Sequence, residues 1–300
     1  MNRIGDIAGF VFYKLFAYSL RLTPRPLALA LGRALGRLVY RLDGRHRRIA
    51  LGNLAIAFGR EKSHTERAAI ARASFAGVGA TAIDTIKFTG YSVARIRSLV
   101  DFEGEDNLVR ALAEGKGVLL FSAHYGNWEA APSVLSEYGP VYAVARALDN
   151  PLIERDLLRL RHRQGSEVIY KAGASRHVLE ALAGGGIVGI VVDQNVLRKR
   201  AVFIDFFGKL AATAAGPAVL HFKSGAPLLP IFCHPRGGRY LVRILPPLDV
   251  PRSGERDADL LKTVRIYTKM IEQEIRREPE PWLWVHKRWN TRPENETKDA

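Results

Sequence analysis

The fold is decided by residues 117–132, which read GVLLFSAHYGNWEAAP. The apolar run GVLLFSA predicts a strand buried on both faces of a sheet. His124, Asn127 and Glu129 follow it at once. Gly126 fits a turn, and Asn127 fits the N-cap of a helix that starts next. The stretch therefore predicts a strand, a turn that carries polar side chains, and a helix.

The same alternation continues along the chain from about Val100. Apolar, β-branched segments predict further strands, and several of the segments between them end in glycine, as helices often do. The expected strands are GVLLFSA, PVYAVAR, SEVIYKA, IVGIVVD, APLLPIF and RYLVRIL, and the helices between them are EDNLVRALAEG, NWEAAPSVLSEYG, PLIERDLLRLRHRQG, SRHVLEALAGG and AGPAVLHFKSG. Helices IALGNLAIAFG and TERAAIARASFAGVGATAIDTIKF precede them, and DADLLKTVRIYTKMIEQEIRR follows. We predict an α/β fold with a mostly parallel central sheet flanked by helices.

Residues 1–48 have a different character. The chain is apolar from Ile4 to Leu20, interrupted by Asp6 and Lys14, and no Ala-x-Ala pattern indicates a cleaved signal peptide. We predict a hydrophobic membrane-anchoring helix here, either as a tilted span or in the membrane interface; a buried soluble helix is the alternative.

A basic stripe follows the apolar segment. Its members recur every four residues, with leucine, alanine and valine between them: Arg33, Arg37, Arg41 and Arg45. Such a basic amphipathic helix is typical of surfaces that meet anionic lipid, although an ordinary solvated helix face has the same pattern. We therefore divide the chain into an N-terminal anchor with a basic helix, residues 1–48, and a single catalytic domain, residues 49–300.

Composition narrows the function classes. The net charge of +15 and pI of about 10.1 indicate anionic partners such as nucleic acid, anionic lipid or a phosphorylated or acidic molecule. One cysteine, Cys233, excludes a disulfide framework and a multi-thiolate metal site. The chain has no Gly-x-Ser-x-Gly elbow, no His-Glu-x-x-His zinc motif and no phosphate loop. GGGIVG at residues 184–189 leads into a strand, the reverse of a dinucleotide-binding context.

Polar side chains follow three of the predicted strands. His124 follows GVLLFSA, Arg146 ends PVYAVAR, and Asp193, Gln194 and Asn195 end IVGIVVD. Ligands of open α/β sheets bind at the carboxyl ends of the strands. The sequence therefore predicts an active site at this edge, with Arg146 as a phosphate or oxyanion ligand, or as an ordinary surface arginine.

His124 and Glu129 form the most specific candidate pair. On one continuous helix they would lie about 140° apart, so they could not easily touch. With His124 in the turn and Glu129 in the first helical turn, the carboxylate could hold one imidazole nitrogen while the other takes a proton from a hydroxyl. We predict a general-base pair without a protein nucleophile.

Two aromatic segments allow more than one interpretation. In DFFGKLAATAAGPAVL, Phe206, Phe207 and Thr213 could line a pocket for an apolar tail or pack in the core. Three tryptophans in PWLWVHKRW could form an interfacial aromatic set or close the core: Trp282, Trp284 and Trp289.

Taken together, the motifs resemble a known family. AHYGNWE, ARALDNP, VVDQN, FFGKLAATAAGPAVL, GAPLLPIF and PWLWVHKRW occur in this order, after RRIALGNLAIAF. They are similar to the bacterial lipid A late acyltransferases, the lauroyl/myristoyl acyltransferases of the lysophospholipid acyltransferase superfamily. The resemblance covers nearly the whole chain and identifies residues 49–300 as an acyltransferase domain.

The resemblance implies an O-acyltransferase at the cytoplasmic face of the bacterial inner membrane. It would move a fatty acyl chain from acyl carrier protein onto a hydroxyl of a lipid A precursor, with no metal or cofactor. The family's His-x4-Asp/Glu pair falls on His124 and Glu129, and its arginine falls on Arg146. We assign the remaining candidates to substrate binding: Asn127, Asp193, Gln194, Phe206, Phe207 and Thr213.

Three alternatives stay open at this level. An acyltransferase could act on another glycolipid, such as a phosphatidylinositol mannoside. A nucleic-acid-binding protein would fit the charge, but the chain has no recognised motif of that kind, so we expect no nucleic acid among its partners. A catalytically dead membrane scaffold is disfavoured by the intact His124 and Glu129.

Overall fold

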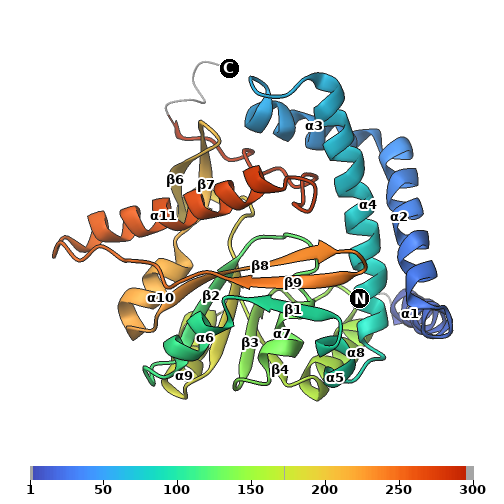
Figure 1. Ribbon diagram of the computed structural model, residues 1–300, viewed down its shortest axis with the longest axis horizontal. Helices are drawn as coiled ribbons and strands as arrows, with labels where there is room; N and C mark the ends of the chain where they lie inside the picture. Colours follow the sequence, from blue (N-terminus) through green and yellow to red (C-terminus); the bar gives the residue numbers. More distant parts are fainter. Residues whose placement is uncertain (1–2, 172, 295–300) are drawn as a thin grey trace.

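A seven-stranded sheet forms the centre of the molecule (Figure 1). The computed structural model describes residues 3–171 and 173–294. The strand order is β1-β9-β8-β2-β5-β3-β4, and every neighbouring pair is parallel except β8 and β9. The strands are β1 Val100–Glu103, β2 Val118–Ser122, β3 Val141–Ala145, β4 Ser166–Tyr170, β5 Ile187–Val191, β8 Leu228–Arg236 and β9 Arg239–Ile244. The predicted α/β fold with a mostly parallel sheet is confirmed.

Helices cover both faces of this sheet, as the apolar strands require. Alternate residues of β2 enter different cores: Leu119 and Phe121 face one, and Val118 and Leu120 face the other. The first core is completed by α9 Ala174–Ala183, α10 Gly216–Ser224 and α11 Arg256–Arg277. The second is completed by α5 Val93–Arg97, α6 Glu105–Leu112 and α7 Ala130–Leu135. Helix α8, Pro151–Arg163, precedes the edge strand β4 and packs against it.

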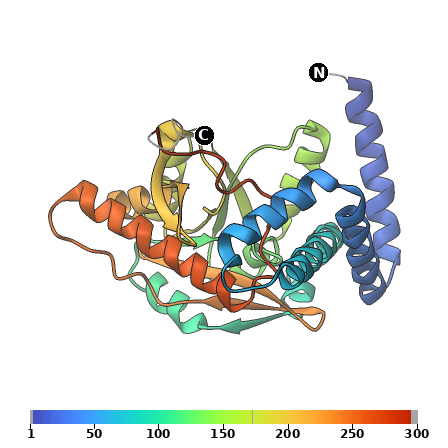
Figure 2. The same ribbon diagram turned by 90° about the horizontal axis from the view of Figure 1, so that it is seen from above.

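The N-terminal helices lie at one edge of the molecule (Figure 2). They are α1 Arg3–Leu22, α2 Arg25–Leu42, α3 Gly44–Phe58 and α4 His64–Phe88. Helix α2 approaches the backbone of α4 closely, because a Cβ at Gly36 would stand 2.1 Å from the carbonyl oxygen of Phe75. The glycine spacing of ALGRALG thus docks α2 on α4. The arginines of α2 lie on its exposed side: Arg33, Arg37 and Arg41. Arg45, the fourth member of the predicted basic stripe, lies in α3, so the stripe does not continue on one helix.

Both helices leave apolar side chains in solvent. On α1 most of the exposed set follows three- and four-residue spacing, which places it on one face: Ile4, Ile7, Val11, Leu15, Tyr18 and Leu22. Phe12 is also exposed, beside this face. On α2 the exposed set is Leu27, Leu31, Leu35, Leu38, Val39 and Leu42. Across the described ranges, we find no helix with the length and apolar content that a membrane crossing would need.

The structure differs from the predicted elements in several places. Three features were not predicted: β1, α5 and the separate hairpin of β6 Ala201–Phe206 and β7 Lys209–Ala214. The predicted helix NWEAAPSVLSEYG is shortened to α7, because the chain before it is held in bridges to Trp282 and Cys233. Gly126 sits in this turn with φ 57°, and a Cβ there would meet the carbonyl oxygen of Cys233 at 1.9 Å.

Candidate active site

Sheet register brings His124 beside Asp193. Strands β2 and β5 are parallel neighbours in which Ser122 pairs with Val191. His124 and Asp193 each lie two residues beyond that pair, so they leave the sheet side by side at its carboxyl edge. Nδ1 of His124 lies 2.7 Å from Oδ1 of Asp193. The expected meeting of strand-end polar groups is therefore present for these two residues.

Asp193 is buried, with 3% of its side chain exposed, and it accepts three hydrogen bonds. Besides Nδ1 of His124, the backbone N–H of His124 donates to Oδ2 at 2.9 Å and the indole N–H of Trp282 donates to Oδ2 at 2.7 Å. Burial alone would raise the pKa of Asp193, but the charge of His124 and these donors outweigh it and lower the pKa. The carboxylate is therefore ionised at neutral pH.

The proton on His124 follows from this partner. A carboxylate only accepts hydrogen bonds, so Nδ1 of the imidazole carries the proton and Nε2 has a free lone pair. The side-chain amide nitrogen of Gln194 lies 3.2 Å from Nε2, and the ring of Trp128 stands edge-on at 5.0 Å. A hydroxyl that approaches Nε2 takes the place of the Gln194 amide. The geometry is that of a general base.

Glu129 has a different partner from the one predicted. Its carboxylate accepts from the Arg161 guanidinium of α8 at 2.9 Å, and both side chains are about one-third exposed, at 31% and 27%. The predicted contact of His124 with Glu129 is replaced by the His124–Asp193 pair. Five residues of chain leave the two groups near each other, but the carboxyl edge of the sheet offers His124 a closer and more buried carboxylate.

A cavity of about 410 Å³ opens beside His124, Glu129 and Arg161. It runs along one face of the sheet, under α7 and α8. Small side chains on that face leave the space: Ser122, Ala143, Ala145 and Gly189. Larger apolar residues of the same strands also line the cavity: Leu120, Val141 and Ile187. Leu135 of α7 and Phe88 of α4 line it as well. The site is therefore a polar mouth on an apolar channel.

Other predicted site residues lie in different settings. Arg146 lines the cavity, but its side chain is 74% exposed and pairs with Asp149 at 3.2 Å. Asn127 is fully buried beside the Tyr240 hydroxyl, with no well-formed hydrogen bond to a described residue, and it does not line the cavity. Substrate contact through Asn127 is thus not supported by its position.

Phe206, Phe207 and Thr213 also lie away from the cavity. The two phenylalanines are buried in the β6–β7 hairpin against the tryptophans, with the Phe206 ring 5.8 Å from that of Trp282. The Thr213 hydroxyl accepts a hydrogen bond from Arg288 at 2.7 Å. The predicted pocket wall is instead a core, and of the two interpretations of the tryptophans the core-closing one is correct.

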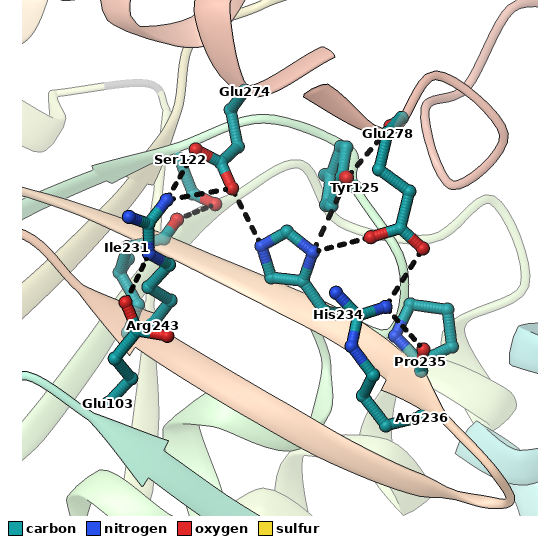
Figure 3. Close-up of polar contacts among 10 residues, drawn as sticks. All are labelled: Glu103, Ser122, Tyr125, Ile231, His234, Pro235, Arg236, Arg243, Glu274 and Glu278. Carbon is teal, nitrogen blue, oxygen red and sulfur yellow. Dashed lines mark hydrogen bonds and ion pairs between the residues drawn. The ribbon is translucent and has the colours of Figure 1, made fainter. Parts of the chain in front are cut away.

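A buried polar cluster anchors the turn that carries His124 (Figure 3). His234 of β8 is 2% exposed, with Nδ1 3.1 Å from Glu278 and Nε2 2.8 Å from Glu274; the second contact has ion-pair distance but poor hydrogen-bond direction. Tyr125, next to His124, donates from its hydroxyl to the carbonyl oxygen of Glu278 at 2.8 Å. Burial, together with the charge of Glu278, raises the pKa of this hydroxyl. It therefore stays a donor.

Metal ligands are not grouped in the described chain. Within residues 3–171 and 173–294, no three His, Cys, Asp or Glu side chains lie close enough to hold an ion. The titratable and cationic side chains that line the cavity include His124, Glu129, Arg146 and Arg161.

Comparison with known proteins places the chain in a family. The family model for bacterial lipid A biosynthesis acyltransferases matches residues 3–291. The chain belongs to this family. A lipid A biosynthesis palmitoleoyltransferase of Escherichia coli is 30% identical over 277 residues, 91% of this chain and 88% of the relative. A lauroyltransferase of the same organism is 28% identical over 274 residues, 90% and 88% of the two chains.

A third relative carries a different acceptor in its name. The phosphatidylinositol mannoside acyltransferase of Mycolicibacterium smegmatis is 27% identical over 223 residues, 73% of this chain and 71% of the relative. All three relatives are acyltransferases by name, and this protein is an acyltransferase.

Two residues of the site had little or no signal in the sequence. Arg161 lies in the middle of a basic helix, and nothing local separates it from the other arginines there. Trp282 stood out only as one of several aromatic residues. Its contact with Asp193 depends on how residues 279–291 fold over the sheet edge, which no spacing within the segment encodes.

Proposed function

We propose that this protein transfers a fatty acyl chain from acyl carrier protein to a hydroxyl of a lipid A precursor. The observation that carries the proposal is the His124–Asp193 pair at the mouth of an apolar cavity, in a chain of this family. The cavity accounts for an apolar donor chain, and the pair accounts for activation of a hydroxyl.

The reaction follows from the positions of the two nitrogens. Nε2 of His124 removes the proton of the acceptor hydroxyl, while Nδ1–H donates to Asp193 and the carboxylate stabilises the imidazolium that forms. The oxygen attacks the thioester carbonyl, a C–O bond forms and the C–S bond breaks. The imidazolium then returns its proton to the leaving thiolate. The balance needs no metal, redox step or covalent enzyme intermediate.

Arg161 is placed to stabilise the negative oxygen of the tetrahedral intermediate. Its guanidinium lines the cavity and is oriented by Glu129 at 2.9 Å. A fixed cation at the point where charge develops accelerates such reactions strongly. Arg146, our first candidate for this role, is 74% exposed at the outer rim, so we give it contact with the donor or acceptor headgroup instead.

We further propose that the protein works at the cytoplasmic face of the bacterial inner membrane, with α1 and α2 in the lipid interface. Support comes from the exposed apolar faces of both helices and from Arg33, Arg37 and Arg41 beside them. Lys14, which interrupts the apolar segment, pairs with Asp156 of α8 at 3.1 Å, so its charge is directed to the protein.

A second acceptor class has a specific observation behind it, the similarity to a phosphatidylinositol mannoside acyltransferase. The deciding experiment is mass spectrometry of the purified protein with acyl carrier protein thioesters and under-acylated lipid A. The proposal predicts a gain of one acyl chain that His124→Gln abolishes and His177→Gln, on the exposed side of α9, leaves intact. If only a mannoside acceptor gains the chain, the lipid A assignment is wrong and acyl transfer stands.

A further inference from the structure

Trp282 touches the catalytic pair without touching the cavity. Its side chain is 1% exposed, and it is absent from the residues that line the substrate space. Its indole N–H lies 2.7 Å from Oδ2 of Asp193. Substrate contact therefore does not explain this side chain, whereas its bond to Asp193 connects it to the reaction.

Trp282 belongs to a strap, residues 279–291, that crosses the turn carrying His124. Backbone bonds join the two segments: Leu283 N–H donates to the His124 carbonyl at 3.0 Å, and Gly126 N–H donates to the Pro281 carbonyl at 3.0 Å. The hydroxyl of Ser74 donates to the Trp282 carbonyl at 2.7 Å. The strap is thus built into the same unit as the catalytic histidine.

The strap is held just before its first residue and again in its middle. Just before it, Glu278 is held by His234 and Arg236 in the cluster of Figure 3. In its middle, the amide of Asn53 donates to the carbonyls of Trp284 and His286 at 2.8 and 2.7 Å. The indole of Trp282 is held edge-on against that of Trp284 at 4.5 Å. The donor that faces Asp193 is therefore preorganised.

The Trp282 indole N–H differs from the other groups near the Asp193 carboxylate, which can carry charge. His124 faces the carboxylate from the turn after β2, and His286 and Arg288 lie near it from the strap. Burial lowers the pKa of Arg288 to about 10. The indole N–H cannot titrate and only donates, so it fills the second acceptor position of Oδ2 at every pH.

We propose that Trp282 is a positioning residue for the reaction, whose indole N–H holds the Asp193 carboxylate in place against Nδ1 of His124. The inference rests on the proposed general-base role of His124. Without the indole N–H, the Asp193 carboxylate can rotate more freely and its negative charge is less stabilised. The Asp193–His124 pair therefore takes up a proton more readily.

The test compares Trp282→Phe with Trp284→Phe. Both side chains are fully buried, and Trp284 donates its indole N–H to the Pro279 carbonyl at 2.7 Å, away from Asp193. For Trp282→Phe we expect kcat to fall about tenfold and the acid limb of the pH–rate profile to move up by about one pH unit. Trp284→Phe should leave the limb in place, and KM for the donor should stay unchanged in both. Equal loss in both variants with an unmoved limb would overturn the proposal.

A measurement on the unmodified protein covers the case in which Trp282→Phe does not fold. The measurement is the NMR signal of the Trp282 indole N–H. The chain has four tryptophans, so phenylalanine variants of Trp128, Trp284 and Trp289 assign that signal by elimination. We expect this N–H signal to move as the pH is lowered and the pair takes up a proton, while the Trp284 signal stays still. A stationary Trp282 signal contradicts the proposal. If no acyl transfer is found at all, the proposed function fails, and this titration still decides the bond to Asp193.

Discussion

Two paired carboxylates, Asp193 and Glu129, lie near the mouth of the same cavity, and they differ in how much water reaches them. In the His124–Asp193 pair the carboxylate is 3% exposed and accepts three hydrogen bonds. In the Glu129–Arg161 pair both side chains are about one-third exposed and line the substrate space. The carboxylate of the first pair is closed off from water, whereas both members of the second pair face the substrate space. This difference supports our proposal that the buried pair transfers the proton and the open pair stabilises charge.

The largest expected effect on kcat comes from the buried carboxylate, Asp193. Asp193→Asn keeps the shape but removes the charge that orients His124 and stabilises its imidazolium. We expect kcat to fall about 10³-fold, with the thermal midpoint little changed. Glu180→Gln on the solvent side of α9 is the matched control and should leave kcat unaltered. Activity near that of the unmodified enzyme would remove Asp193 from the mechanism.

The open pair is tested by Arg161→Gln, with Arg159→Gln on the exposed side of the same helix as the control. Loss of a cation at the developing oxyanion should lower kcat about 10²-fold. Glu129→Gln should act through the same group, so combining it with Arg161→Gln should cost little more than Arg161→Gln alone. If the fold-losses in kcat of the two single variants multiply in the double variant, Glu129 works independently of Arg161.

The N-terminal helices extend the comparison to the protein surface. Replacing Arg33, Arg37 and Arg41 with glutamine should weaken binding to anionic vesicles about 10²-fold, because each arginine near a membrane surface contributes about 1 kcal/mol. The control is a second triple variant that loses the same amount of charge elsewhere, with glutamine at Arg252, Arg256 and Arg265. Equal weakening by both triple variants in vesicle co-sedimentation would show that only net charge matters.

The smallest effect is a change of chain length. A Cβ at Gly189 would have only the Tyr142 carbonyl oxygen near it, at 3.9 Å, so Gly189→Val fills the cavity without a backbone clash. We expect about tenfold lower kcat/KM for the longest accepted chain and a shift of preference to shorter ones. Val188→Ala, on the other face of β5, controls for strand damage. An unshifted preference in competition assays would place the acyl chain elsewhere.

Much of this site could be predicted from the sequence because strand ends are visible in it. His124, Arg146 and Asp193 each follow an apolar run, and parallel strands deliver such residues to one edge. The sequence could not decide which carboxylate His124 would choose. Glu129 is near in the chain, whereas Asp193 is near only because Ser122 pairs with Val191, and that register depends on the whole sheet.

The missed and misplaced residues have a common physical cause. Phe206 and Thr213 carry apolar or small side chains that suit a pocket wall as well as a core, and the tryptophans of the strap decide between them by packing on the hairpin. Arg161 reaches Glu129 across 32 residues, from a helix whose arginines look alike. Such pairings belong to tertiary packing and have no periodic signal in the chain.

The most direct test of the central claim, that Asp193 acts through His124 while Glu129 acts separately, is a pair of double-mutant cycles. Residual acyl transfer would be measured by mass spectrometry for His124→Gln alone and in combination with Asp193→Asn or Glu129→Gln. The account predicts that adding Asp193→Asn to His124→Gln slows transfer no further, and that adding Glu129→Gln slows it by its full single-variant factor. The reverse pattern, with Glu129 silent once His124 is gone and Asp193 still contributing, would contradict it.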